Sequence, residues 1–139
     1  MTKVIYTGYF VNDVQKLLDE VPIALSGDNV KIYAHHLTKE FRPAKRIDGL
    51  SVGTSKTIYA YGQVVTEHIQ AILIRDEAES LTKNRFPHIT IATANDTPPS
   101  ESNAAIEKAI ADNTVIAFAE PIPILVTEGY FDGSVVHIS

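Results

Sequence analysis

The chain has 139 residues and a formal net charge of −5, from 12 basic and 17 acidic side chains. It has no cysteine, which excludes a disulfide scaffold, a thiol nucleophile and zinc sites built on thiolates. The acidic balance argues against a long duplex nucleic acid as partner, because such a partner needs a basic surface, but it permits a small anionic ligand.

The first half of the chain predicts a strand, a helix and a second strand. Residues 4–11 are rich in the β-branched and aromatic side chains typical of a strand. Asn12 is placed to cap a helix with one apolar face. A turn signal at residues 26–29 separates this helix from a strand over residues 30–41.

The second half predicts mostly strands. Residues 57–65 and 68–75 are expected to form a hairpin. A helix that Ser100 or Ser102 caps should run to about residue 111 and stop near Asn113. The other predicted strands are short, and a turn at Asp132-Gly133 joins the last two: they span residues 88–93, 115–118, 122–128 and 134–138.

Each half contains one helix and one strand with a His-x-Thr pattern, which indicates a weak internal duplication. Strands outnumber helices, and the hairpins imply antiparallel pairing, so the pattern favours the α+β class. The length suits a single domain over residues 1–139, and no segment resembles a linker between two domains.

The His-x-Thr strands carry the most informative side chains. Side chains in a strand alternate between its two faces, so His36 and Thr38 share one face, as do His88 and Thr90. The apolar residue between each pair points the other way, into packing. If approximate symmetry relates the two halves, both polar pairs meet in one cleft.

Two imidazoles that face each other suit the hydrolysis of a phosphodiester. One imidazole takes a proton from the attacking water and the other donates a proton to the leaving oxygen, since histidine titrates near neutrality. The threonine hydroxyls can donate hydrogen bonds to the non-bridging oxygens. This chemistry needs no metal and no cofactor.

The pattern is short, and chance alone would give about 0.7 matches among five histidines. The chain has three, because His137-Ile138-Ser139 also matches; we interpret that match as chance. We expect His35 to face away from His36, in a structural or solvent-facing position. His68 is expected at the surface, beside a hairpin turn.

Five segments together resemble the 2H phosphoesterase superfamily, which takes its name from two His-x-(Ser/Thr) motifs. The resemblance covers most of the chain. It is strongest to the compact branch with the cyclic phosphodiesterase domain of tRNA ligases and the "Swiss Army Knife" RNA-repair-like proteins. The segments are Tyr6–Phe10, His35–Thr38, Ile69–Ile72, Pro87–Thr90 and Ser102–Asn103.

The resemblance implies a bilobal fold, with two pseudo-symmetric lobes of antiparallel sheet and flanking helices. It implies catalytic roles for His36, Thr38, His88 and Thr90. The implied activity is metal-independent hydrolysis of cyclic phosphodiesters, first of all the 2′,3′-cyclic phosphate of an RNA 3′ end or a nucleotide. Some phage members of the superfamily cleave cyclic oligonucleotide messengers of bacterial immunity, so degradation of a cyclic di- or oligonucleotide is an alternative.

Two alternatives come from other functional classes. A non-catalytic module could bind a nucleotide in the same cleft without turning it over. A metal hydrolase is the other alternative, although no carboxylate lies at a recognisable ligand spacing from the histidines.

Further residues are candidates for substrate binding. Lys83 and Arg85 precede the second motif closely and suit a phosphate, although ordinary loop charge is the alternative. Tyr6 and Tyr9 suit base stacking, although many strand tyrosines serve only in packing.

The sequence predicts no membrane partner. Its apolar runs are shorter than the roughly 20 residues that a membrane helix needs, and its N-terminus has no hydrophobic signal core. We therefore expect a cytoplasmic protein, in the host cytoplasm if the source is viral. The sequence does not indicate an oligomeric state.

Overall fold

The computed structural model describes residues 5–25, 29–41, 52–75 and 87–138. Two helices, α1 (Val14–Glu20) and α2 (Ser102–Asp112), accompany one antiparallel sheet, and the short 3-10 turn Pro99–Glu101 leads into α2. The strands of the sheet are β1 (Tyr6–Val11), β2 (Lys31–Ile32), β3 (His36–Phe41), β4 (Ser55–Val65), β5 (Ile69–Ile74), β6 (His88–Thr93), β7 (Ile116–Phe131) and β8 (Val136–His137).

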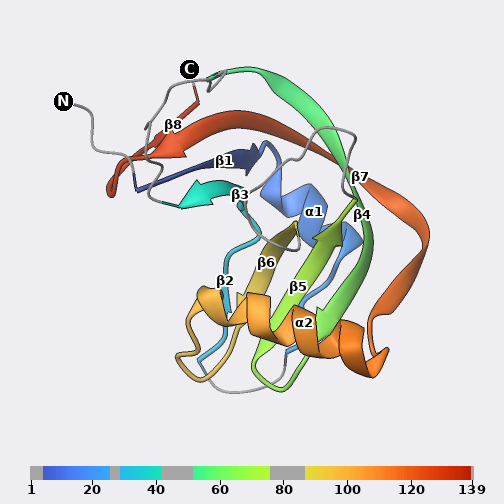
Figure 1. Ribbon diagram of the computed structural model, residues 1–139. Coiled ribbons are helices and arrows are strands. Elements are labelled where there is room, and N and C mark those ends of the chain that lie inside the picture. Colours follow the sequence, from blue (N-terminus) through green and yellow to red (C-terminus); the bar gives the residue numbers. More distant parts are fainter. Residues whose placement is uncertain (1–4, 26–28, 42–51, 76–86, 139) are drawn as a thin grey trace.

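Six of these strands form a closed barrel (Figure 1). Their order is β1-β3-β6-β5-β4-β7, and β7 pairs back to β1 to complete the ring. The short strands β2 and β8 extend the sheet by pairing with β6 and β7. None of the helices in the described ranges is long and apolar enough to cross a membrane.

The expected bilobal α+β fold is wrong, because the two halves of the chain share this one mostly-β barrel. The predicted strands 115–118 and 122–128 are one strand, the 16-residue β7, which begins at Ile116. One part of β7 pairs with β4 and another part pairs with β1, so the strand joins both halves into one sheet. Pro121 is tolerated because the pairing with β4 is irregular there, between Ala117 and Ile122.

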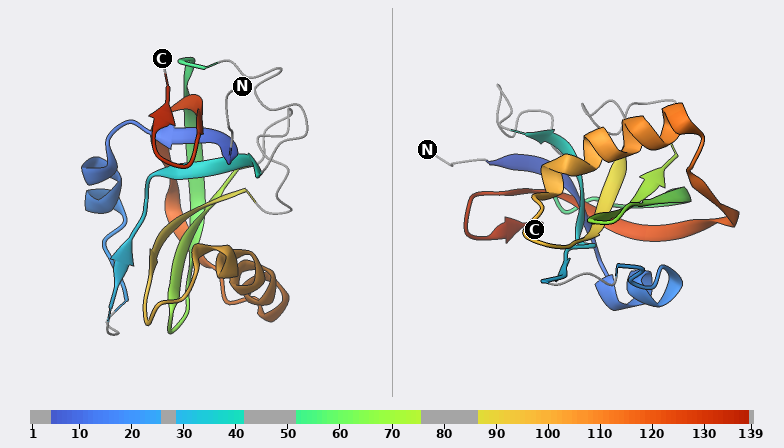
Figure 2. Two further views of the ribbon diagram at one scale, coloured as in Figure 1. Left: turned by 90° about the vertical axis from the view of Figure 1, so that its left-hand side faces the viewer. Right: turned by 90° about the horizontal axis from the view of Figure 1, so that it is seen from below.

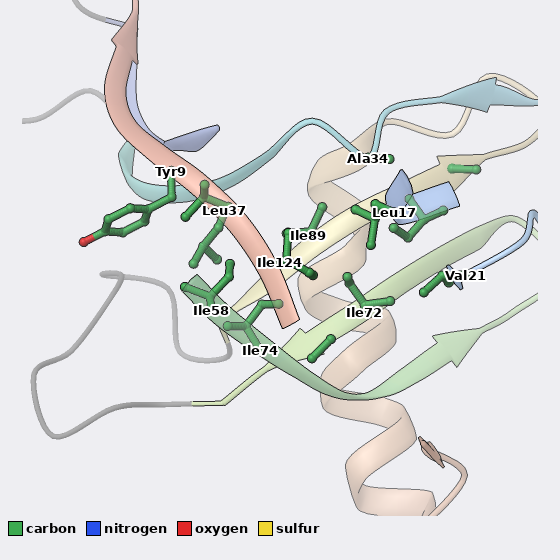
Figure 3. Packing of buried hydrophobic residues seen from close by; sticks show 14 residues of the cluster. Tyr9, Leu17, Val21, Ala34, Leu37, Ile58, Ile72, Ile74, Ile89 and Ile124 are labelled. Carbon is green, nitrogen blue, oxygen red and sulfur yellow. The ribbon is translucent and has the colours of Figure 1, made fainter. Parts of the chain in front are cut away.

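The barrel is filled by side chains from its inward face (Figure 3). Residues of β3, β6, β5, β4 and β7 alternate between this interior and the outer face, as the strand period requires. Leu17 of α1 joins the same cluster. The largest contributors, each at most 5% exposed, are Leu37, Ile58, Ile72, Ile74, Ile89, Ile91 and Ile124.

Helix α2 covers the outside of the barrel across β4 and β5, on a different side from α1 (Figure 2). This cover explains why all six residues of β5 are buried. Ile72 points into the barrel, whereas Ala71 and Leu73 pack against Ile106 of α2. The helix stops at Asn113, which has a left-handed φ of 59°, and the predicted stop is confirmed.

The predicted hairpin is confirmed, with β4 and β5 as its strands, and so is the predicted strand β6. The predicted cap of the first helix is wrong by one residue. The carboxylate of Asp13 accepts a hydrogen bond from the backbone N–H of Lys16 at 3.1 Å. The Asn12 side chain instead accepts a hydrogen bond from Thr127 at 2.7 Å, which links the start of α1 to β7.

Candidate functional site

The two His-x-Thr segments lie on neighbouring strands of the barrel. β3 and β6 pair antiparallel, with Leu37 of one opposite Ile89 of the other. Both residues are fully buried in the core (Figure 3). Because side chains alternate, the described flanking residues His36, His88 and Thr90 belong to the outer face. This register brings His36 level with Thr90 and puts His88 on the same face.

His36, His88 and Thr90 line one cavity of about 710 Å³ on that outer face. Its size lies within the range of small-molecule binding sites. An apolar wall comes from Tyr6 and Phe10 of β1, Phe131 of β7 and Val136 of β8. The remaining lining residues come from the β2–β3 connection and from the start of α2: Tyr33, His35, Pro99, Ser100 and Asn103.

His36 is held between two other rings. The Tyr6 ring stacks on it at a centroid distance of 4.6 Å and an interplanar angle of 24°. The His35 ring stacks on it at 4.5 Å and 22°. The Nδ1 atom of His36 lies 3.5 Å from the Tyr6 hydroxyl and in hydrogen-bond contact with Nδ1 of His35. The ring is therefore fixed by residues of β1 and of the segment before β3.

This environment favours neutral His36. Burial lowers the pKa of His36 to about 3, and the charges that His35 and His88 carry when protonated act in the same direction. The pKa of His35 is also lowered by burial. Burial raises the pKa of Tyr6 to about 12, so that its hydroxyl keeps its proton near neutrality. An imidazole that is neutral at pH 7 can accept a proton, as a general base must.

The expectation that His35 faces away from His36 is wrong, because the two rings stack. The predicted strand 30–41 is broken into β2 and β3. Ala34, just before His35, has a φ of 53°, in the left-handed region that alanine rarely adopts. This break suspends the alternation of side chains and turns His35 to the side of His36.

Thr90 is tied to the start of α2. Its Oγ1 atom lies 2.8 Å from the Oγ atom of Ser102, which is fully buried. Ser102 thus does not cap the helix; the residue at the cap position is Glu101, without a side-chain hydrogen bond. The bond holds the N-terminus of α2, with its partial positive charge, beside the cavity that Ser100 and Asn103 also line.

The four candidate substrate-binding residues, and the catalytic candidate Thr38, have different placements. Tyr6 lines the cavity. Tyr9 packs in the barrel interior at 5% exposure and does not line the cavity, because its position on β1 points inward. Lys83 and Arg85 lie outside the described residues. Thr38 lies on β3 opposite Gly8 of β1, and its side chain is also outside the described part.

The other two histidines are away from this cluster. His137 binds Asp132, with 2.7 Å between Nε2 and Oδ2, and stacks on Tyr130 at 4.5 Å. His68 lies in the turn between β4 and β5, where its Nδ1 lies 3.3 Å from Nδ2 of Asn95. Neither histidine lines the cavity.

The sequence pattern missed the apolar wall of the cavity. Phe10, Phe131 and Val136 come from strands that meet only in the closed barrel. Phe10 is the register partner of His36, and the β7–β8 hairpin brings in the other two. No local signal identifies these residues, because their shared position depends on strand pairing over more than 100 residues of chain.

Within the described residues, no group of three or more histidine, aspartate or glutamate side chains is placed to hold a metal ion. Comparisons of the sequence with protein-family models and with curated proteins give no match.

Proposed function

We propose that the protein is a metal-independent phosphodiesterase of the two-histidine type, and that it hydrolyses cyclic phosphodiesters of nucleotides. The first substrate class is the 2′,3′-cyclic phosphate of an RNA 3′ end or a nucleotide. One observation carries this proposal: the register of Leu37 with Ile89 gathers His36, His88 and Thr90 at one cavity.

In the proposed reaction, neutral His36 is the general base and His88 the general acid. His36 takes a proton from a water molecule as the water oxygen bonds to phosphorus. The bond from phosphorus to the 2′ or 3′ oxygen breaks, and His88 gives its proton to that oxygen. The lowered pKa of His36 supports this assignment of the two roles.

A base with a pKa of about 3 is weak in the empty site. A bound phosphodiester brings a negative charge beside the imidazole, and an opposite charge favours the protonated form. The pKa of His36 should therefore rise when the substrate binds, so that the base gains strength where it is needed. The same charge favours protonated His88.

Thr90 and the start of α2 suit the non-bridging oxygens of the phosphate. If the Ser102 hydroxyl donates to Oγ1 of Thr90, the Thr90 hydroxyl is left to donate to the substrate. The partial positive charge at the helix N-terminus adds to this attraction. Thr38 is assigned the matching role by the sequence pattern alone.

The apolar wall suits the nucleoside part of the substrate. Phe10, Phe131 and Val136 offer aromatic and aliphatic surface to the cavity. Base stacking on such side chains is tolerant of sequence. The Tyr6 ring is already packed against His36 and Phe131, at 4.6 and 5.3 Å, so we assign it to holding His36.

The test is phosphorus NMR with chromatography, in the presence of a chelator. The substrates are nucleoside 2′,3′-cyclic phosphates and a panel of cyclic dinucleotides, with His36→Gln/His88→Gln as the inactive variant. We expect opening of the 2′,3′-cyclic phosphate by the native chain and none by the variant.

Each of the other outcomes of this assay favours a different substrate class, function or mechanism. Turnover of cyclic dinucleotides alone would replace the substrate class with cyclic messengers. Recovery of every substrate intact, with stoichiometric binding, would overturn the proposal in favour of a nucleotide-binding module. Activity that vanishes in chelator and returns with added metal would overturn the metal-free mechanism.

A further inference from the structure

The proposed reaction assigns no task to His35, although this residue lines the cavity. Its ring stacks on His36 at 4.5 Å, and the two Nδ1 atoms are in hydrogen-bond contact. The centroid of the Tyr33 ring also lies 5.8 Å from that of His35, with an interplanar angle of 57°. Tyr6, His36, His35 and Tyr33 thus form a row of rings along the cavity.

A hydrogen bond between two Nδ1 atoms uses one proton and one lone pair, so its direction is linked to the tautomer of each neutral ring. If His35 donates, the proton of neutral His36 is on Nε2 and the ring has no free lone pair for catalysis. If His36 donates, its Nε2 atom carries the lone pair. Only the second arrangement makes His36 a base at the nitrogen that remains for the substrate.

We propose that His35 is a positioning residue, whose Nδ1 lone pair accepts the Nδ1–H of His36 while its ring and that of Tyr6 fix the plane of the His36 ring. The catalytic part of this inference rests on the proposed function. The structural part concerns only the proton on His36, and it stands without any substrate.

Among the described residues, the titratable groups that face His36 are Tyr6 from β1, His35 from the preceding segment and His88 from β6. Neutral His35 can accept a hydrogen bond, and the partial desolvation that lowers its pKa favours this neutral form, although the residue is exposed at the cavity. When His36 takes a proton at Nε2, the Nδ1–H···Nδ1 bond becomes charge-assisted and therefore stronger. His35 would thus stabilise the protonated base.

Two matched variants separate the acceptor from the stacking ring. In His35→Asn, the amide oxygen lies near the place of Nδ1 and can still accept, but the ring is lost. In His35→Phe, the ring remains and the acceptor is lost. Thermal unfolding of each variant shows that it is folded before other measurements are interpreted.

The first measurement is nitrogen NMR of the His36 ring in the substrate-free protein, which reports tautomer and pKa. We expect the Nδ1–H tautomer at pH 7 in the native chain and in His35→Asn. In His35→Phe we expect a shift toward the Nε2–H tautomer. An Nε2–H tautomer in the native chain, or an unchanged tautomer in His35→Phe, would overturn the proposal.

The second measurement is the rate of cyclic phosphate opening. In His35→Phe, kcat should fall about ten-fold or more, as expected for a wrong tautomer, with KM changed about two-fold at most. His35→Asn should retain most of the native kcat. An unchanged kcat in His35→Phe would overturn the catalytic part. If the native chain turns over no substrate, the proposed function fails while the NMR result still tests His35.

Discussion

The same three-residue pattern has different surroundings in two regions of the molecule. On β3 and β6 the two motifs meet in register, and their histidines line a cavity. On β8 the third match begins at His137, which pairs with Asp132 and stacks on Tyr130. In that hairpin it is the neighbour Val136 that lines the cavity. A His-x-(Ser/Thr) pattern therefore predicts which side chains share one face of a strand. The neighbouring strands determine which other side chains lie beside them.

The two regions also differ in how their histidines are held. His36 is packed between rings, and burial lowers its pKa to about 3. His137 has a carboxylate partner, and its hydrogen bond is the main cause that lowers the pKa of Asp132 to about 2. The first environment favours a neutral imidazole that can take up a proton. The second ties the hairpin together with an ion pair when His137 is protonated.

The largest expected effect is on activity, and it separates the two regions directly. His88→Gln removes the proposed acid, so kcat for the cyclic phosphate should fall about 10²- to 10⁴-fold. His137→Gln changes a histidine outside the cavity and should leave kcat within about three-fold. Steady-state kinetics of the two variants checks this difference. Equal losses in both variants would show that the register does not select the working histidines.

The next effect is on stability, since the register depends on the buried residues between the motif partners. Leu37→Ala or Ile89→Ala should lower the free energy of unfolding by about 2–5 kcal/mol, because each leaves a cavity in the core. The matched control is Leu125→Ala on β7, where the side chain is 52% exposed; it should change stability by about 0.5 kcal/mol or less. Denaturant unfolding measures all three variants.

If Leu37→Ala or Ile89→Ala lowered the free energy of unfolding only slightly, the buried packing of these two residues would not be what aligns the motifs. The two side chains are neighbours in one cluster. The loss of unfolding free energy in the double variant Leu37→Ala/Ile89→Ala should therefore differ from the sum of the losses in the two single variants. Strict additivity would indicate that they do not interact.

The sequence predicted strands better than it predicted how they pair. The alternation around Leu37 and Ile89 identified the correct faces, and Asn113 and the β4–β5 hairpin were located from local signals. Closure of the barrel was not predictable in this way. It depends on β7 continuing past Pro121 to pair with β1, a long-range contact without a local signal.

The candidate site shows the same limit. Its polar residues follow from strand period, whereas its apolar wall and the turn of His35 depend on tertiary contacts. Ala34 illustrates this: its φ of 53° is unfavourable for alanine, and the surrounding backbone imposes it. The backbone N–H of Ala34 donates to the carbonyl of Thr90 at 2.9 Å, so the strand carrying the second motif helps to fix the bend before the first.

The smallest effects concern the pH dependence of stability, where the two regions should respond in different windows. The pKa of folded His36 is about 3, below the 6.5 of an ordinary histidine, so the unfolded chain binds the proton first on acidification. Stability from this group is complete above about pH 6.5 and is lost as the pH falls toward 3. His36→Gln should flatten the fall of Tm between these limits.

Asp132 should act only at lower pH. Its folded pKa of about 2 is below its ordinary 3.8, mainly because of the hydrogen bond with His137 and then those from Val135 and Ser134. The stability it contributes is present above about pH 3.8 and is lost as the pH falls through about 2. Asp132→Asn should therefore leave the slope of Tm between pH 6.5 and 4 no flatter than in the native chain and flatten only the part below it.

Calorimetry across this pH range compares both variants with the native chain and with Ile89→Val, which lowers stability without removing an ionisable group. The effect of Asp132→Asn should be the smaller one, because that side chain lies in an exposed turn where solvent screens its charge. Two results would contradict the assignment of the higher pH window to His36 and the lower one to Asp132. One is a flatter dependence of Tm on pH above pH 4 in Asp132→Asn, and the other is an unchanged dependence in His36→Gln. In that case the ring packing of His36 would not be what keeps it neutral.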